Sequence, residues 1–160
     1  EYGDMVPEEL RGTHEVPTAA LMEDLGRRFG ARLEAGDMLV LTGPLGAGKT
    51  TLTRGIGEGL GVRGPVQSPT FVIARTHPSL RGGAPLIHAD AYRLGDAGEL
   101  EDLDLDLDDS VTIVEWGRGL VEQIADEWWD IEIVRPVGEA DDAENLDLDA
   151  PRTVVITRHA

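Results

Sequence analysis

The stretch that most constrains the fold is residues 38–51, MLVLTGPLGAGKTT. Four apolar residues lead into Thr42, and Gly43 then opens the pattern Gly-x-x-x-x-Gly-Lys-Thr, which ends at Thr50. This is the spacing of a phosphate-binding loop between a strand and a helix. Glycines let the backbone curl into a nest of inward N–H groups, and the following helix adds the positive end of its dipole. The stretch therefore predicts a nucleoside triphosphate site.

The residues of this loop have separate predicted roles. The glycines Gly43, Gly46 and Gly48 shape the cradle, while Lys49 neutralises the outer phosphates and the Thr50 hydroxyl binds the bridging magnesium. The alternative is a glycine-rich turn without a ligand, because glycine makes up 20 of the 160 residues. Against this, the other basic residues are all arginines, so Lys49 is the one lysine of the chain. A compact ammonium suits a backbone cradle better than a flat guanidinium.

Length and composition favour one domain over residues 1–160, with residues 1–12 as a flexible leader. A hydrophobic content of 41% can supply a core. The absence of cysteine fits a reducing cytoplasm, which is the expected location. The sequence has neither a secretory signal pattern nor an apolar stretch of about 18 residues.

The net charge of −17 argues against a protein that grips nucleic acid by its phosphates. Two acidic segments carry much of this charge, residues 96–109 with eight acids and residues 138–150 with six. The remaining 17 acids nearly balance the 14 basic residues. The alternating aspartates from Asp102 to Asp108 lack the glycine and glutamate of an EF-hand, so a solvated connector or a docking surface for a basic partner fits better.

The hydrophobic pattern predicts an α/β domain with three layers and a mostly parallel central sheet, of the P-loop NTPase-like kind. Helices are expected after Thr18, from about Thr50 to Leu60, and from Leu120 to Trp128. The first helix is expected to bury Leu21, Leu25, Phe29 and Leu33. Strands are expected at residues 13–16, 38–41, 71–75, 84–89, 111–114, 130–134 and 153–157, and the third and fourth of these form a hairpin.

Two carboxylates could complete the site. Glu115 ends the apolar run from Val111, which is how a buried strand delivers an acid to a phosphate loop. Asp90 shares one side of an extended chain with His88, so both could face the phosphates. A solvated strand end is the alternative for either acid. For His88 a hydrogen-bonded structural role is favoured over a metal ligand, and Trp116 fits core or pocket wall.

Four motifs in this order, GPLGAGKTT, SPTF, HADAYRL and IVEWG, closely resemble the bacterial TsaE (YjeE) family over about residues 18–134. These are small ATPases of tRNA threonylcarbamoyladenosine biosynthesis. The resemblance implies that the ATP phosphates are bound by Gly46, Ala47, Gly48, Lys49, Thr50 and Thr51.

The resemblance implies further roles outside this loop. Thr50 and Glu115 serve the magnesium, Asp90 is needed for hydrolysis and Trp116 for activity. Ser68 and Thr70 fall in a switch-like loop near the γ-phosphate. The adenine pocket falls near residues 19–22 and Arg152.

The resemblance also implies partners. The ATPase of this family binds a complex of TsaB-type and TsaD-type proteins, which carries out threonylcarbamoyl transfer, and its ATP turnover keeps that complex cycling. Contact with tRNA is then indirect, and the acidic surplus agrees with a protein partner. ATP and Mg²⁺ are the implied cofactors.

Two other functions stay open at this point. A small-molecule kinase would share the loop and an aspartate base, but it normally needs an arginine-bearing lid, and the middle of this chain is acidic. A non-catalytic, nucleotide-gated binding module would bind ATP without needing Asp90 or Glu115. A GTPase is disfavoured because Asn-Lys-x-Asp and Asp-x-x-Gly do not occur in the sequence.

Overall fold

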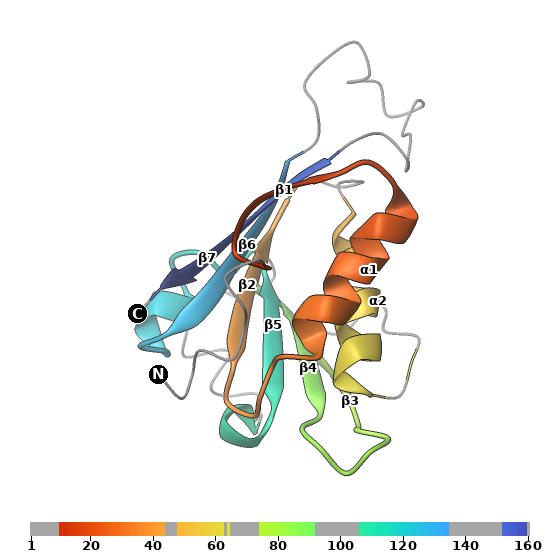
Figure 1. Ribbon diagram of the computed structural model, residues 1–160. Coiled ribbons are helices and arrows are strands. Elements are labelled where there is room, and N and C mark those ends of the chain that lie inside the picture. The colour runs from red at the N-terminus through yellow and green to blue at the C-terminus, as the bar shows by residue number, and fades with distance from the viewer. Residues whose placement is uncertain are drawn as a thin grey trace.

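The computed structural model describes residues 10–43, 48–62, 64, 74–91, 106–134 and 152–159. Seven strands form one sheet in the order β1-β7-β6-β2-β5-β4-β3 (Figure 1). Their bounds are β1 Gly12–Val16, β2 Met38–Thr42, β3 Ala74–His77, β4 Leu86–Asp90, β5 Val111–Glu115, β6 Trp128–Val134 and β7 Arg152–His159.

The centre of the sheet is parallel and its margins are antiparallel. Strand β2 lies between β6 and β5 and is parallel to both, and β4 extends the parallel block beyond β5. The antiparallel pairs are β1 with β7, β7 with β6, and β3 with β4. The predicted α/β class is therefore confirmed. The expected hairpin is also present as β3 and β4, whereas residues 71–73 lie outside the described part.

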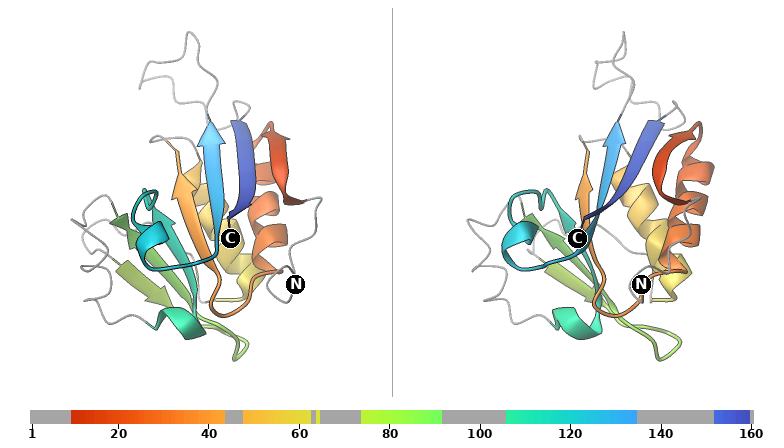
Figure 2. Two further views of the ribbon diagram at one scale, coloured as in Figure 1. Left: turned by 90° about the vertical axis from the view of Figure 1, so that its left-hand side faces the viewer. Right: turned by 60° about the vertical axis from the view of Figure 1, so that its left-hand side comes forward.

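Two helices, α1 (Ala19–Gly30) and α2 (Lys49–Leu60), pack side by side on one face of the sheet (Figure 1). The opposite face carries the short 3₁₀ helix η4 (Val121–Gln123) and the chain around it (Figure 2). A second 3₁₀ helix, η3 (Leu107–Asp109), immediately precedes β5.

Alternation along β2 supplies apolar side chains to both faces. Leu39 and Leu41 belong to the larger core beneath α1 and α2, while Met38 and Val40 join the smaller core around Val121. Burying a leucine side chain contributes about 1.5–3 kcal/mol. A strand that is apolar on both faces is thereby fixed in the middle of the sheet, which is how the strand before the loop acquires its position.

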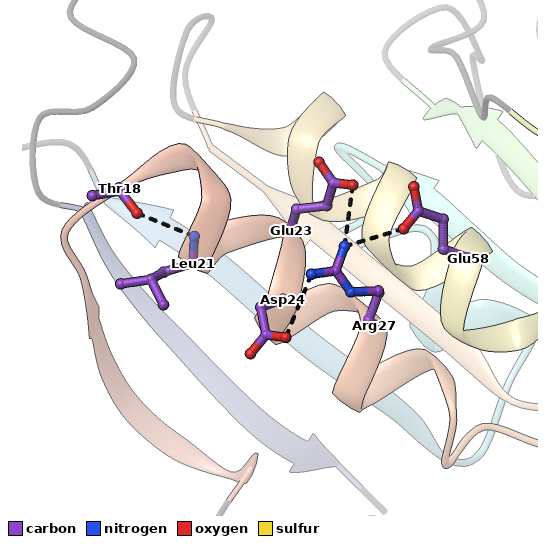
Figure 3. A network of polar contacts seen from close by, with 6 residues as sticks. All are labelled: Thr18, Leu21, Glu23, Asp24, Arg27 and Glu58. Carbon is purple, nitrogen blue, oxygen red and sulfur yellow. Dashed lines mark hydrogen bonds and ion pairs between the residues drawn. The ribbon is translucent and has the colours of Figure 1, made fainter.

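Helix α1 begins as expected, because the Thr18 hydroxyl accepts a hydrogen bond from the Leu21 N–H at 3.2 Å (Figure 3). The expected buried stripe was wrong at one end, since Leu21 is 48% exposed. A spacing of four residues drifts by about 40° per step on a helix of 3.6 residues per turn. The buried face instead contains Met22, Leu25, Gly26, Phe29 and Gly30.

Glycines let the backbones of α1 and α2 approach closely. A Cβ on Gly26 or Gly30 would overlap the carbonyl oxygen of Leu52 or Ile56 in α2. The relation is reciprocal, because a Cβ on Gly55 or Gly59 would overlap the carbonyl oxygen of Glu23 or Arg27 in α1. The helix glycines, which weaken an isolated helix by about 1 kcal/mol each, are thus required by packing.

Arg27 adds polar contacts along this seam. Its guanidinium lies 3.2 Å from both Glu23 and Glu58 and 3.5 Å from Asp24 (Figure 3). All of these side chains are substantially exposed, so solvent screening leaves the network little net stabilisation. The glycine contacts, not the ion pairs, set the distance between the helices.

Two other expectations are corrected. The predicted helix at 120–128 is only η4, because Gly119 adopts a left-handed φ of 84° and Trp128 and Trp129 are paired within the sheet. The leader ends earlier than expected, because Leu10 is 2% exposed in the core and β1 begins at Gly12. Within the described residues, no helix has the length and apolarity needed to cross a membrane.

We expect the seam between α1 and α2 to reject a single methyl group. Gly59→Ala improves helix propensity, yet its Cβ would overlap the Arg27 carbonyl oxygen. The free energy of unfolding, measured by urea denaturation, should fall by roughly 1–3 kcal/mol.

Gly83→Ala is the control for this variant, because the nearest atom to a Cβ there is Ser79 Oγ at 3.7 Å. Its change should stay within about 0.5 kcal/mol. Unchanged or increased stability of Gly59→Ala would contradict the close approach.

Candidate functional site

The candidate site lies where the parallel strands end. Strand β2 ends at Thr42, and β4 and β5 end at Asp90 and Glu115, which are partners in the sheet register. Because parallel strands point the same way, their carboxyl ends meet at one edge, where ligands bind in open α/β sheets. Helix α2 begins beside this edge at Lys49.

The N-terminus of α2 is built to accept an anion. Its N-cap is Gly48, with a left-handed φ of 107°, and a glycine has no side chain that could cap the first turn. The first N–H groups of a helix have no intrahelical partners, and the dipole makes them attractive to negative charge. The Met22 side chain of α1 packs against Gly48, where a Cβ would lie 3.3 Å from Met22 Cε.

Lys49 contacts two residues from the end of β5. Its ammonium lies 3.5 Å from Glu115 Oε1 and 4.3 Å from the ring centroid of Trp116. The Lys49 and Glu115 side chains are 12% and 9% exposed, so their charges are only partly screened. The single lysine of the chain therefore lies between a carboxylate and an aromatic face.

His88 holds the other oxygen of Glu115. Its Nε2 lies 2.6 Å from Glu115 Oε2, and the imidazole is completely buried. Burial raises the pKa of Glu115, but the hydrogen bond and charge of His88, helped by Lys49, outweigh it and hold that pKa below its ordinary value. The carboxylate is therefore ionised at neutral pH, and it accepts a hydrogen bond from the imidazole.

Asp90 extends the cluster along the same edge. Along β4, Leu86 belongs to the core beneath the helices, so by alternation His88 and Asp90 also point to that side. Ala89, between them, is fully buried on the other face. The expectation that His88 and Asp90 share a side of the chain agrees with this alternation.

Trp116 occupies a strained position at the end of β5. Its φ is 61°, the one positive value among the described non-glycine residues, and it is 41% exposed. Its backbone N–H donates to the Leu41 carbonyl at 3.0 Å, which ties the bend to β2. A bulky residue in this conformation costs energy that the surrounding structure must offset, and such strain is commonly found at functional sites.

The structure thus brings together Lys49, Asp90, Glu115 and Trp116 at the start of α2, where Thr50 and Thr51 also lie, with Gly43 directly after β2. Gly46, Ala47, Ser68 and Thr70 lie outside the described residues. Arg152 is buried at the start of β7, opposite Val16. The hydrogen-bonded role expected for His88 is confirmed, although its partner was missed. The signal in the sequence was that His88 and Asp90 share one face of their strand, which placed His88 on the side of the candidate site where Glu115 also lies.

A magnesium ion fits this donor set only together with a ligand that supplies oxygens. Within the described ranges, no group of three or more His, Cys, Asp or Glu residues could hold a metal. Mg²⁺ is usually bound by one or two protein oxygens, by phosphates and by water. Glu115 at the strand end and Thr50 in the first turn of α2 are suitable protein donors.

A central parallel strand, followed in the sequence by a glycine-rich segment and a helix, defines an α/β protein of the P-loop NTPase-like fold. Residues 16–142 match the family model described as threonylcarbamoyl adenosine biosynthesis protein TsaE. The chain therefore belongs to the TsaE family.

Individual relatives agree with this assignment. The tRNA threonylcarbamoyladenosine biosynthesis protein TsaE of Streptomyces coelicolor is 61% identical over 124 residues, which cover 76% of this chain and 84% of the relative. The protein of the same name from Mycobacterium tuberculosis is 47% identical over 133 residues, covering 78% and 79%. The crystal structure of YdiB from Bacillus subtilis matches with a TM-score of 0.67 and 28% identity, covering 92% of this chain and 84% of that one.

The depressed pKa of Glu115 predicts a specific acid sensitivity. The unfolded chain, with the ordinary value of 4.5, binds this proton more readily than the folded protein. The resulting stability is present above pH 4.5 and is lost as the pH falls through the lower folded pKa.

Glu115→Gln should therefore have a free energy of unfolding that depends less steeply on pH in the acid range than that of wild type. Urea denaturation between about pH 3 and pH 7 measures both slopes. Equal slopes below pH 4.5 would contradict a depressed pKa.

Proposed function

We propose that this protein binds and hydrolyses ATP, with Mg²⁺, as an accessory protein of tRNA threonylcarbamoyladenosine biosynthesis. The observation that carries the proposal is the contact of Lys49 with Glu115, 3.5 Å apart, at the start of α2, where the N-cap is a glycine. A cation, a carboxylate and the N–H groups at the start of a helix are parts that phosphoryl chemistry needs. Membership of the TsaE family supports the pathway.

The start of α2 and its lysine hold the phosphates. The N–H groups of the first turn donate to phosphate oxygens, and Lys49 carries its ammonium to the outer phosphates on a flexible stem. Gly43, Gly46, Ala47 and Gly48 are further proposed phosphate-binding residues, and the glycines among them have no Cβ to hinder a close approach. Thr51 completes the phosphate-binding residues, and Trp116 forms a wall of the site.

Two carboxylates serve the reaction itself. Glu115, ionised and fixed at the strand end, holds the magnesium together with the Thr50 hydroxyl. Asp90, its neighbour in the register, orients the attacking water as a general base. Magnesium, when bound with ATP, neutralises the charge that develops on the transferred phosphoryl group.

The partner we propose is the pair of TsaB-type and TsaD-type proteins that transfers the threonylcarbamoyl group. A net charge of −17 favours a protein partner over direct contact with tRNA, because like charges repel across an interface. The relatives from Streptomyces coelicolor and Mycobacterium tuberculosis carry names from the same pathway. Such a protein works in the cytoplasm, where tRNA is modified.

We expect Lys49→Ala to bind ATP much more weakly than wild type and to keep its fold. The ammonium is proposed to bind a ligand and is not part of the core, and Glu115 keeps its hydrogen bond to His88 when the lysine side chain is removed. Loss of a charged hydrogen bond should weaken ATP binding by about 10–100-fold. Isothermal calorimetry measures the affinity, and circular dichroism verifies the fold.

Arg28→Ala is the matched control, because it removes a positive charge from the exposed side of α1. Its ATP affinity should equal that of wild type. Wild-type affinity in Lys49→Ala would contradict the assignment of the phosphate site.

The pathway is tested by capture from a bacterial extract. With ATP and Mg²⁺, the immobilised wild-type protein and Arg28→Ala should retain the TsaB-type and TsaD-type proteins, whereas Lys49→Ala should not. Retention that is equal with and without ATP would reject nucleotide-dependent assembly. Phosphoryl transfer to a small acceptor, with no stimulation of ATP turnover by these proteins, would favour the kinase alternative.

A further inference from the structure

The two oxygens of Glu115 are held by partners of different mobility. Oε2 accepts from His88 at 2.6 Å, and Oε1 lies 3.5 Å from Lys49 Nζ. His88 lies within β4 and is paired on both sides, with Arg75 in β3 and with Ile113 in β5. Its backbone is therefore fixed, whereas Lys49 has a four-carbon stem and partial exposure.

The exchange of partners has an energetic consequence. A lysine that turns to a bound phosphate leaves Oε1 and removes a positive charge from a largely buried carboxylate. A buried carboxylate without a partner is costly, and it tends to reorient or take up a proton. The bond to His88 persists through this change, because it does not involve the lysine.

The polar contacts of His88 indicate that it does more than fill space in the core. Among the described residues, its Nδ1 has no hydrogen-bond partner, although the ring is fully buried. Burying a polar ring atom without a partner is unfavourable, because its hydration is lost and not replaced. An apolar residue would fill the same volume without this cost, so packing alone does not account for a histidine here.

We propose that His88 is a positioning residue that fixes Glu115 through Oε2 and leaves Oε1 available. In the absence of nucleotide Oε1 contacts Lys49. When the lysine moves to phosphate, Oε1 is available for magnesium or its water. The inference rests on the proposed function. It adds that the oxygen of Glu115 left for the metal or its water would be Oε1, and that the orientation of the carboxylate is set by a residue of the neighbouring strand β4. Residues that orient a metal ligand in this way typically change metal affinity by 10–100-fold when altered.

The test compares two polar replacements of different reach. In His88→Gln the amide nitrogen can occupy the place of Nε2 and donate to Glu115, whereas His88→Asn is too short to do so. Thr112→Val is the control, because its buried hydroxyl has no partner among the described residues and lies on the opposite face of β5 from Glu115. Circular dichroism and thermal unfolding verify each fold.

Calorimetry gives the dissociation constant of a non-hydrolysable ATP analogue in EDTA and in excess Mg²⁺. The dissociation constant in EDTA divided by that in Mg²⁺ measures the coupling between metal and nucleotide, without relying on turnover. In His88→Asn we expect this ratio to be at least about tenfold smaller than in wild type, with binding in EDTA unchanged. His88→Gln and Thr112→Val should stay within about threefold of wild type.

Three results would overturn the inference. The first is a wild-type ratio of one, and the second is an unchanged ratio in His88→Asn. The third is an equal decrease of the ratio in His88→Asn and His88→Gln, because it would mean that the shape of the ring matters and its hydrogen bond does not. Failure of the wild-type protein to bind the nucleotide at all would instead refute the proposed function, and the inference with it.

Discussion

The contact between the backbones of α1 and α2 is the constraint on which the rest of the molecule depends. Four glycines remove the side chains that would separate the helices. Helix α2 therefore lies at a fixed depth over the sheet, and its first residue, Lys49, reaches the end of β5. A helix displaced outward would move that ammonium away from Glu115 and would separate Met22 from Gly48, so the packing of the body determines the geometry of the site.

The charge arrangement of the site follows from this placement. The chain as a whole carries a net charge of −17, yet the start of α2 combines a helix dipole with the one lysine. An anionic ligand is attracted locally despite the surrounding charge, because partly buried charges at short range are screened less than distant exposed ones. Glu115 and the Trp116 ring hold the lysine at this point, and His88 keeps the carboxylate ionised and oriented.

Local patterns in the sequence predicted local structure well. The strand before the loop, the Thr18 cap and α2 each depend on neighbouring residues, and each was found. The bond between His88 and Glu115 joins residues 27 positions apart and depends on the register of β4 and β5, which no short pattern encodes. The prediction of a helix over residues 120–128 was wrong for a related reason, because pairing of Trp128 and Trp129 within the sheet overrides a weak helical pattern. The glycines of α2 lower the helix propensity of the segment, and only the packed structure reveals the partner helix that requires them.

On nucleotide binding, we propose, the ammonium of Lys49 leaves Glu115 for the phosphates. Because the chain contains one lysine, protein labelled with ¹⁵N-lysine gives a single side-chain ammonium resonance at position 49. Titration with the non-hydrolysable ATP analogue and Mg²⁺ should shift this resonance along the binding isotherm, and adenosine, which lacks phosphates, should leave it in place. A resonance that stayed unchanged while the nucleotide saturated the protein would show that Lys49 does not contact the phosphates.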